Sequence, residues 1–289
     1  MIQFFGYFFY ETMYNTFRIG IVCEYIDHKL NLEYIFRKRK QANAFWKQDE
    51  LEKMIVSLIS TLSHMQSVGL CHRDLKPANL FQMPTGEVKI IDFGESKDYF
   101  REGEDGGDPT TATIRGTPQY LSPILWKAHV VDGSSRFAKH NIFKSDVFSI
   151  GLMFYQLSSM EDVTGFNQKT AEYDGEKLIE AGIKRLKSRY GEIFCETIRL
   201  MLRFYETERP SFVELANIVL VTVSDVSTLP EKEREALIQS PNAGKVLQPK
   251  INPQAIQLIQ KHFSMKTIAQ NNQTANNSKL AANSSSNQP

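Results

Sequence analysis

The residues best suited to chemistry lie close together in residues 69–94, GLCHRDLKPANLFQMPTGEVKIIDFG. Asp74 is followed by Lys76 and Asn79, and Asp92 comes after a short turn. Transfer of a phosphoryl group from a nucleotide needs a carboxylate to orient the attacking hydroxyl, oxygen ligands for Mg²⁺ and a cation near the migrating group. Two carboxylates, one amide and one lysine on neighbouring loops therefore predict a phosphoryl-transfer site.

Each of these residues has a simpler interpretation when it is taken alone. Asp74 could cap a helix, Asn79 could close a turn, and Lys76 could be a solvated surface charge. All three together would have to be accidents in the right order. The functional hypothesis is therefore the favoured one.

The ordered pair HRDLKPAN and DFG resembles the catalytic loop and the metal loop of protein kinases. The resemblance implies an α+β protein-kinase-like fold, ATP and Mg²⁺ as cofactors, and a protein substrate. It implies that Asp74 orients the acceptor hydroxyl and that Lys76 neutralises charge on the γ-phosphate. It also implies that Asn79 and Asp92 bind Mg²⁺, while the packing of Phe93 sets the position of the metal loop.

The resemblance gives roles to residues outside the central motif. Structural or regulatory roles fall to His72, Arg73, Phe93, Gly94, Asp146 and Arg209. Asp146 begins an apolar helix, and the resemblance implies that it accepts hydrogen bonds from the catalytic-loop backbone. Thr117, in GTPQYLSP, would hydrogen-bond toward Asp74 and Lys76, which indicates serine or threonine acceptors.

The start of the chain is expected to supply the nucleotide pocket. Residues 1–10 and 17–25 have the composition of two strands, which could also form an ordinary buried hairpin. Under the resemblance they are the last two strands of the small lobe, and Phe4 would pack in the apolar stack that contains His72 and Phe93. Adenine contacts would then come from the following residues: Cys23 at the back of the pocket, Glu24, Tyr25 and Ile26 in the hinge, and Phe81 beneath the ring.

The stretch from Asp92 to Pro123 resembles an activation segment. Its middle is polar and rich in glycine, and long loops of this kind are usually functional or mobile. Candidate phosphate acceptors are Thr110, Thr111 and Thr113. Arg73 is the cation that could receive the added charge, and an unmodified flexible loop is the alternative that stays open.

One corner departs from the kinase pattern. Ile124 stands where the family has a glutamate, and the arginine that such a glutamate pairs with is present as Arg209. Because a buried guanidinium without a carboxylate is costly, another acid is expected, and Asp132 is one candidate. The segment 125–142 is also longer than is typical of the family.

Hydrophobic periodicity predicts the helices that carry these loops. Apolar residues recur at spacings of three and four over residues 48–68, and residues 144–157 are apolar nearly all round, as in a buried helix. The remaining expected elements are helices at 30–40, 176–188, 191–204 and 211–222, strands at 79–82 and 88–91, and weak helices at 230–239 and 253–262.

The domain prediction follows from the extent of the resemblance. Residues 1–222 are expected to form a kinase domain, with a small-lobe remnant and hinge at 1–28 and a helical large lobe at 29–222. Residues 223–289 are expected to be a C-terminal extension, disordered from residue 267 onward, because Asn, Gln, Ser and Ala bury little apolar surface.

Some parts of a complete kinase small lobe have no counterpart here. No GxGxxG motif occurs, and residues 1–25 contain no lysine. The helix glutamate that pairs with such a lysine in kinases is not recognisable either. The sequence is either an incomplete copy of an active kinase or a natural short form that acts as a scaffold or decoy. In both cases this polypeptide alone is expected to transfer phosphate poorly, because half of the positioning elements are missing.

The composition of the chain argues against several other classes of protein. The net charge of +1 gives no reason to expect a nucleic-acid partner, and the basic run at 37–40 is interpreted as a solvated helix face. Three scattered cysteines do not suit a disulfide framework or a zinc site. No apolar run approaches the ~20 residues of a membrane span. An intracellular, cytoplasmic protein of unspecified oligomeric state is expected, with a pseudokinase-like binding module as the alternative to an enzyme.

Overall fold

The computed structural model of the chain describes residues 1–14, 16–99, 111–131 and 137–219. The chain divides into two compact units, Met1–Ala216 and Asn217–Pro289. The fold and the site described below belong to the first unit. The helices predicted at 230–239 and 253–262 and the disorder predicted from residue 267 lie outside the described residues.

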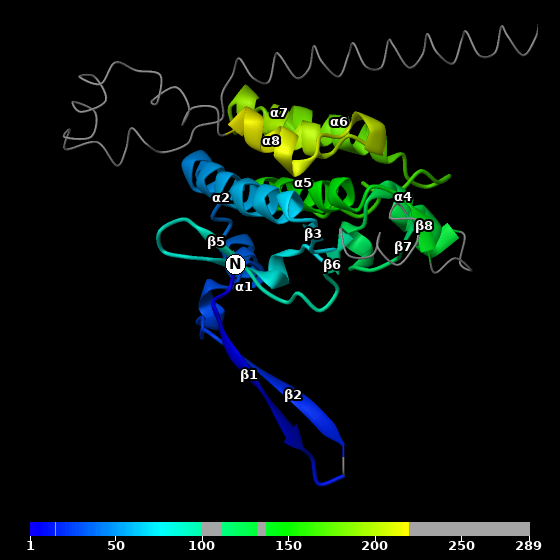
Figure 1. Cartoon of the computed structure of the whole chain (residues 1–289). Helices are drawn as coiled ribbons and strands as arrows, with labels where there is room; N and C mark the ends of the chain where they lie inside the picture. The colour runs from blue at the N-terminus through cyan, green and yellow to red at the C-terminus, as the bar shows by residue number, and fades with distance from the viewer. Residues whose placement is uncertain (15, 100–110, 132–136, 220–289) are drawn as a thin grey trace, which may run out of the picture. The chain divides into compact units, whose positions relative to one another are not determined.

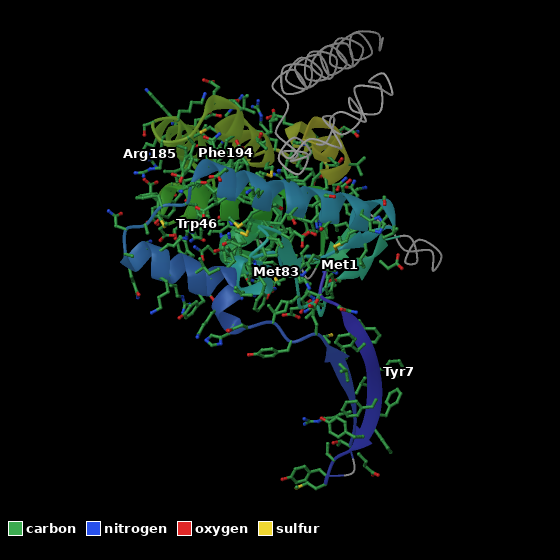
Figure 2. The ribbon with its side chains drawn as sticks, turned by 90° about the vertical axis from the view of Figure 1, so that its left-hand side faces the viewer. Met1, Tyr7, Trp46, Met83, Arg185 and Phe194 are labelled. Atoms are coloured by element: carbon green, nitrogen blue, oxygen red, sulfur yellow. The ribbon has the colours of Figure 1, made fainter. Side chains whose placement is uncertain are left out.

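The N-terminal hairpin consists of β1 (Phe4–Glu11) and β2 (Phe17–Cys23), paired antiparallel from Phe4 opposite Cys23 to Glu11 opposite Phe17. Both strands were predicted, but the buried hairpin is wrong. Phe9 is 65% exposed and Ile21 is 70% exposed, and Figure 2 shows Tyr7 standing out from the hairpin. Within the described residues no further strand pairs with β1 or β2, so their aromatic side chains remain uncovered.

This exposure also corrects the stack predicted for Phe4. The Phe4 side chain is 58% exposed, so it does not pack in an apolar column. His72 and Phe93 do contact each other, with ring centroids 5.2 Å apart. The predicted stack is therefore present only in its two large-lobe members.

Helices make up most of the remaining first unit (Figure 1). α2 (Gln48–Ser67) buries the predicted apolar stripe, which includes Leu51, Met54, Ile55, Leu58, Ile59, Leu62 and Met65. Its start is capped by the Glu50 carboxylate, which accepts a 2.8 Å hydrogen bond from the Lys47 backbone N–H. Gly69 follows it at a φ of 79°, a conformation that favours glycine, and the chain then enters the catalytic loop.

The core is built around α5 (Ile142–Ser159), whose residues 145–158 are all buried. α5 packs against α2 on one side and against α6 (Gly175–Leu186) and α7 (Glu192–Met201) on the other, as Figure 1 shows. A Cβ atom on Gly151 would lie 2.9 Å from the Cβ atom of Met201, so glycine permits this close helix approach. The prediction of a buried helix here is confirmed.

Shorter elements hold the loops in place. The remaining helices are α1 (Leu32–Gln41), α4 (Pro123–Trp126), a π-helical turn (Lys127–Val131) and α8 (Phe212–Val219), with 3₁₀ turns at His28–Leu30, Pro77–Asn79, Pro118–Tyr120 and Glu206–Glu208. The short antiparallel strand pairs are β3 (Leu70–Cys71) with β6 (Lys97–Asp98), β4 (Leu80–Gln82) with β5 (Val88–Ile90), and β7 (Thr111–Thr113) with β8 (Phe137–Lys139). Among the described residues, no helix has the length and apolarity needed to cross a bilayer.

Candidate active site

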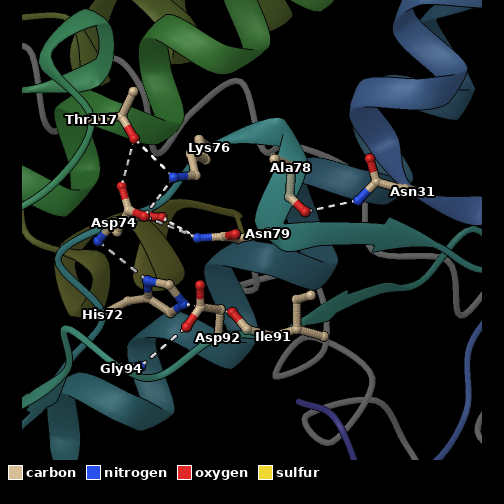
Figure 3. Close-up of polar contacts among 10 residues, drawn as sticks. All are labelled: Asn31, His72, Asp74, Lys76, Ala78, Asn79, Ile91, Asp92, Gly94 and Thr117. Carbon is tan, nitrogen blue, oxygen red and sulfur yellow. Dashed lines mark hydrogen bonds and ion pairs between the residues drawn. The ribbon is translucent and has the colours of Figure 1, made fainter. Parts of the chain in front are cut away.

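The Asp74 carboxylate is the centre of a compact polar cluster (Figure 3). Lys76 Nζ donates to Asp74 Oδ2 at 2.7 Å, and the Thr117 hydroxyl donates to Asp74 Oδ1 at 2.9 Å. Asn79 Nδ2 donates to the Asp74 carbonyl oxygen at 2.8 Å and lies 3.2 Å from Oδ2. Lys76 Nζ also donates to Thr117 Oγ1 at 2.9 Å. The hydrogen bonds expected of Thr117 are therefore present, and three side chains from two segments meet at the Asp74 carboxylate.

The backbone that carries Asp74 is held from beneath by Asp146. The Asp146 carboxylate accepts hydrogen bonds from His72 N at 2.8 Å and from Arg73 N at 3.0 and 3.2 Å. Arg73 has a φ of 71°, a left-handed conformation that is strained for a residue with a side chain and needs support. Asp146 is only 4% exposed, and this burial raises its pKa to about 6 against the opposing effect of the His72 and Arg73 contacts. The carboxylate anchors the loop as expected for Asp146.

The metal loop is tied to the catalytic loop through Ile91. Ile91 N donates to the Asn79 carbonyl oxygen at 3.0 Å, and the Ile91 carbonyl oxygen lies 3.0 Å from His72 Nε2. The next residue, Asp92, has a φ of 61° and an exposed side chain, whose Oδ1 accepts only a long 3.4 Å contact from Gly94 N. Figure 3 shows the Asp92 side chain with this contact to Gly94 N.

The predicted hinge is joined to β5 by an ion pair that the sequence did not reveal. Lys89 Nζ lies 2.5 and 2.7 Å from the two carboxylate oxygens of Glu24, and this contact lowers the Glu24 pKa. Lys89 is opposite Phe81 in the β4–β5 pair. The hinge and Phe81 are therefore brought together, and Cys23, Ile26 and Phe81 are all half-buried.

Asn31 is a second residue that sequence reasoning missed. Its side-chain oxygen accepts from Glu33 N and Tyr34 N at the start of α1, and its Nδ2 donates to the Ala78 carbonyl oxygen at 2.8 Å. One side chain thus caps the helix after the hinge and also holds the catalytic loop. An asparagine directly before the apolar periodic stretch LEYIF is a helix-start signal that could have identified it.

Comparison with known proteins agrees with this geometry. The family model described as "Protein kinase domain" matches residues 7–221, which is most of the chain. The chain belongs to the protein kinase family.

The chain is also similar to individual protein kinases, among them one whose name states that it is a serine/threonine kinase. The chain is 34% identical over 192 residues to the G2-specific protein kinase nim-1 of Neurospora crassa, covering 65% of this chain and 20% of that protein. It is 30% identical over 207 residues to the serine/threonine-protein kinase Nek2 of Homo sapiens, covering 70% of this chain and 42% of that protein. The chain spans less than half the length of these relatives.

The departure from the kinase pattern at Arg209 is resolved without a carboxylate. The guanidinium is fully buried and donates to the carbonyl oxygens of Arg203 at 2.8 and 3.0 Å, Phe204 at 3.1 Å and Lys144 at 2.7 Å. It also stacks over the Phe148 ring at 4.7 Å, and burial lowers its pKa to about 9. The expectation that another acid supplies the pair is not met in these contacts.

Two positions bear on the expected carboxylate partner of Arg209: Ile124, where the family has a glutamate, and Asp132, the candidate replacement. Ile124 is on α4 and is 38% exposed, so the position that carries a glutamate in other kinases faces partly to solvent. Asp132 falls outside the described residues. The carbonyl oxygens that accept from Arg209 belong to Lys144 in the first turn of α5 and to Arg203 and Phe204, which follow α7.

Of the candidate phosphate acceptors, Thr113 has the clearest surroundings. Arg73 Nη2 donates to the Thr113 carbonyl oxygen at 2.5 Å and lies 2.7 Å from its hydroxyl oxygen. Thr111 lies in β7, where the structure describes the backbone pairing, and Thr110 is outside the described residues. Arg73 thus contacts Thr113 in its unmodified form.

A groove of about 310 Å³ opens beside the cluster. Its lining includes Lys76, Thr117, Arg37 of α1 and Tyr120. The Tyr120 hydroxyl donates to Gln156 Oε1 at 2.6 Å, and burial raises the Tyr120 pKa, so the phenol stays neutral.

Proposed function

We propose that this kinase domain transfers the γ-phosphoryl group of ATP to serine or threonine hydroxyls of a protein substrate. The observation that carries the proposal is the Asp74 carboxylate, which is held on both oxygens by Lys76 and Thr117. Such fixed orientation is what a base needs in order to accept the proton of an attacking hydroxyl. The groove beside Lys76 and Thr117 would receive the substrate segment.

Different residues act on the hydroxyl that accepts the phosphoryl group and on the phosphoryl group that is transferred. Asp74 orients the hydroxyl and accepts its proton, while Lys76 supplies positive charge where negative charge accumulates during transfer. Thr117 keeps both groups in register, because its hydroxyl contacts each of them. The pairing of lysine and threonine at these positions supports serine or threonine acceptors.

The chain offers donors that fit Mg²⁺ and a nucleotide. Asp92 provides an exposed carboxylate, and Asn79 uses its amide nitrogen on Asp74, which leaves its amide oxygen for a cation. Mg²⁺ prefers oxygen ligands and is often held by one or two protein groups together with phosphates. When bound, the ion would neutralise phosphate charge. The half-buried residues Cys23, Ile26 and Phe81, with the Glu24 backbone, would hold the adenine.

Binding of a fluorescent ATP analogue to the purified 289-residue chain would test the nucleotide site. Binding should require Mg²⁺, and Asp92→Asn should weaken it by about tenfold or more, because a metal ligand is lost. The matched control is Asp49→Asn, an exposed position near the start of α2. If the affinity for the analogue is the same without Mg²⁺ and in Asp92→Asn, the non-catalytic scaffold is favoured.

Transfer is tested separately with radiolabelled ATP and a degenerate serine/threonine peptide library. We infer that the chain alone turns over slowly, because no glycine-rich loop or strand lysine is recognisable in its sequence. Asp74→Asn should keep nucleotide binding and lower transfer by about a hundredfold or more. Equal transfer by Asp74→Asn and by the unaltered chain would refute the role of Asp74.

A further inference from the structure

The end of the activation segment pairs with a strand from the long connection that follows it. β7 (Thr111–Thr113) and β8 (Phe137–Lys139) are antiparallel, with Thr111 opposite Lys139 and Thr113 opposite Phe137. β8 lies within residues 125–142, the stretch that the sequence marks as longer than usual. Residues of this connection thus contact the segment that carries the candidate phosphate acceptors.

The centre of β8 is fixed to the end of the same segment. Ala138 is 7% exposed and packs in an apolar cluster with Leu121 and Leu125. Ile114 and Trp126 pack against this cluster from the sides. β8 therefore contacts the segment on both sides of Thr117, through the ladder before it and through the apolar cluster after it.

A neutral histidine completes the support of β8. His140 is 6% exposed, and its Nδ1 lies 2.9 Å from the Ala138 carbonyl oxygen. Burial lowers the pKa of His140, so the ring is uncharged at neutral pH. The attachment of β8 thus depends on backbone pairing and apolar contact, neither of which needs an added charge.

The segment has little freedom between β7 and Thr117. Gly116 has a φ of 109°, and a Cβ atom there would lie 2.7 Å from the Arg73 carbonyl oxygen. Arg73 also holds the Thr113 carbonyl and hydroxyl oxygens. Because Arg73 is adjacent to Asp74, a displacement of β7 would be transmitted to the contacts that Thr117 makes with Asp74.

We propose that β8 is a positioning strand that keeps the activation segment docked on the catalytic loop without a phosphate on Thr113. The inference concerns regulation and rests on the proposed function of the Asp74 site. Arg73 contacts the unmodified threonine, and β8 supplies the hold that an added phosphate would otherwise provide. The domain is thus set in its docked arrangement by β8.

Hydrogen exchange of amides 111–117, followed by mass spectrometry, tests this without requiring turnover. The unaltered chain, shown to be unphosphorylated by its intact mass, should exchange these amides about a hundredfold more slowly than an unstructured peptide. Ala138→Asp places a carboxylate in the apolar cluster and should speed exchange about tenfold or more. Val130→Asp, at a half-exposed position, is the matched control and should leave exchange within about twofold.

A milder variant covers the case in which Ala138→Asp disturbs the whole domain. Ala138→Gly only removes a methyl group and loosens the strand, so it should speed exchange of amides 111–117 by about two- to fivefold. Amides of α5 serve as the internal reference and should not change. A transfer assay then asks whether Ala138→Gly lowers activity and whether phosphorylation of Thr113 restores it, as the proposal expects.

Two results would overturn the role of β8. One is slow exchange of amides 111–117 that appears only after Thr113 is phosphorylated. The other is slow exchange that persists unchanged in both Ala138 variants. Neither result depends on nucleotide binding, so a failure of this inference is distinct from a failure of the Asp92→Asn test.

Discussion

Replacement of Asp146 by asparagine should separate the stability of this domain from the geometry of its catalytic loop. The Asp146 pKa rises from 3.8 to about 6 because burial outweighs the hydrogen bonds that the carboxylate accepts from His72 N and Arg73 N. This net shift corresponds to about 3 kcal/mol against the ionised form. Asparagine removes the penalty and keeps one acceptor oxygen. At pH 7.5, Asp146→Asn should therefore destabilise the domain by less than about 2 kcal/mol.

The difference in stability between the unaltered domain and Asp146→Asn should depend on pH, and the sign of that dependence follows from the Asp146 pKa. The folded-state pKa of Asp146 lies above its unfolded value, so the folded state binds a proton more readily between pH 4 and 6. Folding is thus favoured by acid at this site, and that stabilisation is lost as the pH rises through about 6. Between pH 7.5 and 4.5, the unaltered domain should gain about 2 kcal/mol relative to Asp146→Asn.

Urea unfolding at pH 7.5 and pH 4.5, followed by far-ultraviolet circular dichroism, measures both quantities. Asp49→Asn is the control, because it makes the same change of side chain at an exposed position. Transfer should fall by about tenfold or more in Asp146→Asn even where the domain stays folded, since the left-handed Arg73 backbone loses one of its acceptors. A stability difference that is the same at both pH values would refute the reasoning, as would unimpaired transfer.

Four further substitutions test other parts of the structure. Arg209→Met should lower the free energy of unfolding by about 3–5 kcal/mol, because several buried carbonyls lose a charged donor; a loss below about 1 kcal/mol in urea unfolding would contradict this. Glu24→Gln and Lys89→Met should each weaken binding of the fluorescent ATP analogue, and the double variant should be no worse than either one; additive losses would show that the ion pair does not act as a unit. The Glu24 contribution should disappear as the pH falls through its lowered pKa. Gly151→Ala should cost about 1–3 kcal/mol in thermal unfolding, because the new methyl group meets Met201, and an unchanged melting temperature would be the contrary result.

The order of the motif and the positions of the helices could be predicted from the sequence. The HRDLKPAN and DFG pattern, the apolar stripe of α2 and the continuous burial of α5 are local features, since each depends on residues within a few turns of one another. Glycine at 69 ends α2 for an equally local reason, because it adopts a left-handed backbone. These local signals were enough to indicate the family and the candidate residues of its loops.

Other features were decided by contacts between distant segments. The sequence placed a cation at Lys89 and a carboxylate at Glu24, but only the fold shows that they meet. The family pattern indicated a carboxylate for Arg209, whereas the packing of α5 presents carbonyl oxygens instead. The family resemblance predicted that Phe4 packs in an apolar stack, but Phe4 is exposed, because within the described residues no further strand pairs with β1 or β2.

The same distinction applies within the site itself. Residue types and spacing determined which groups could carry out phosphoryl transfer, because that chemistry needs carboxylates, an amide and a lysine in a particular order. The contacts of Thr117 and Asp146 with the catalytic loop were expected from the family resemblance, whereas the pairing of β8 with β7 became known only from the tertiary structure. The chemical groups of the side chains can be recognised in the sequence. The distances between remote side chains are fixed only when the core packs around α5.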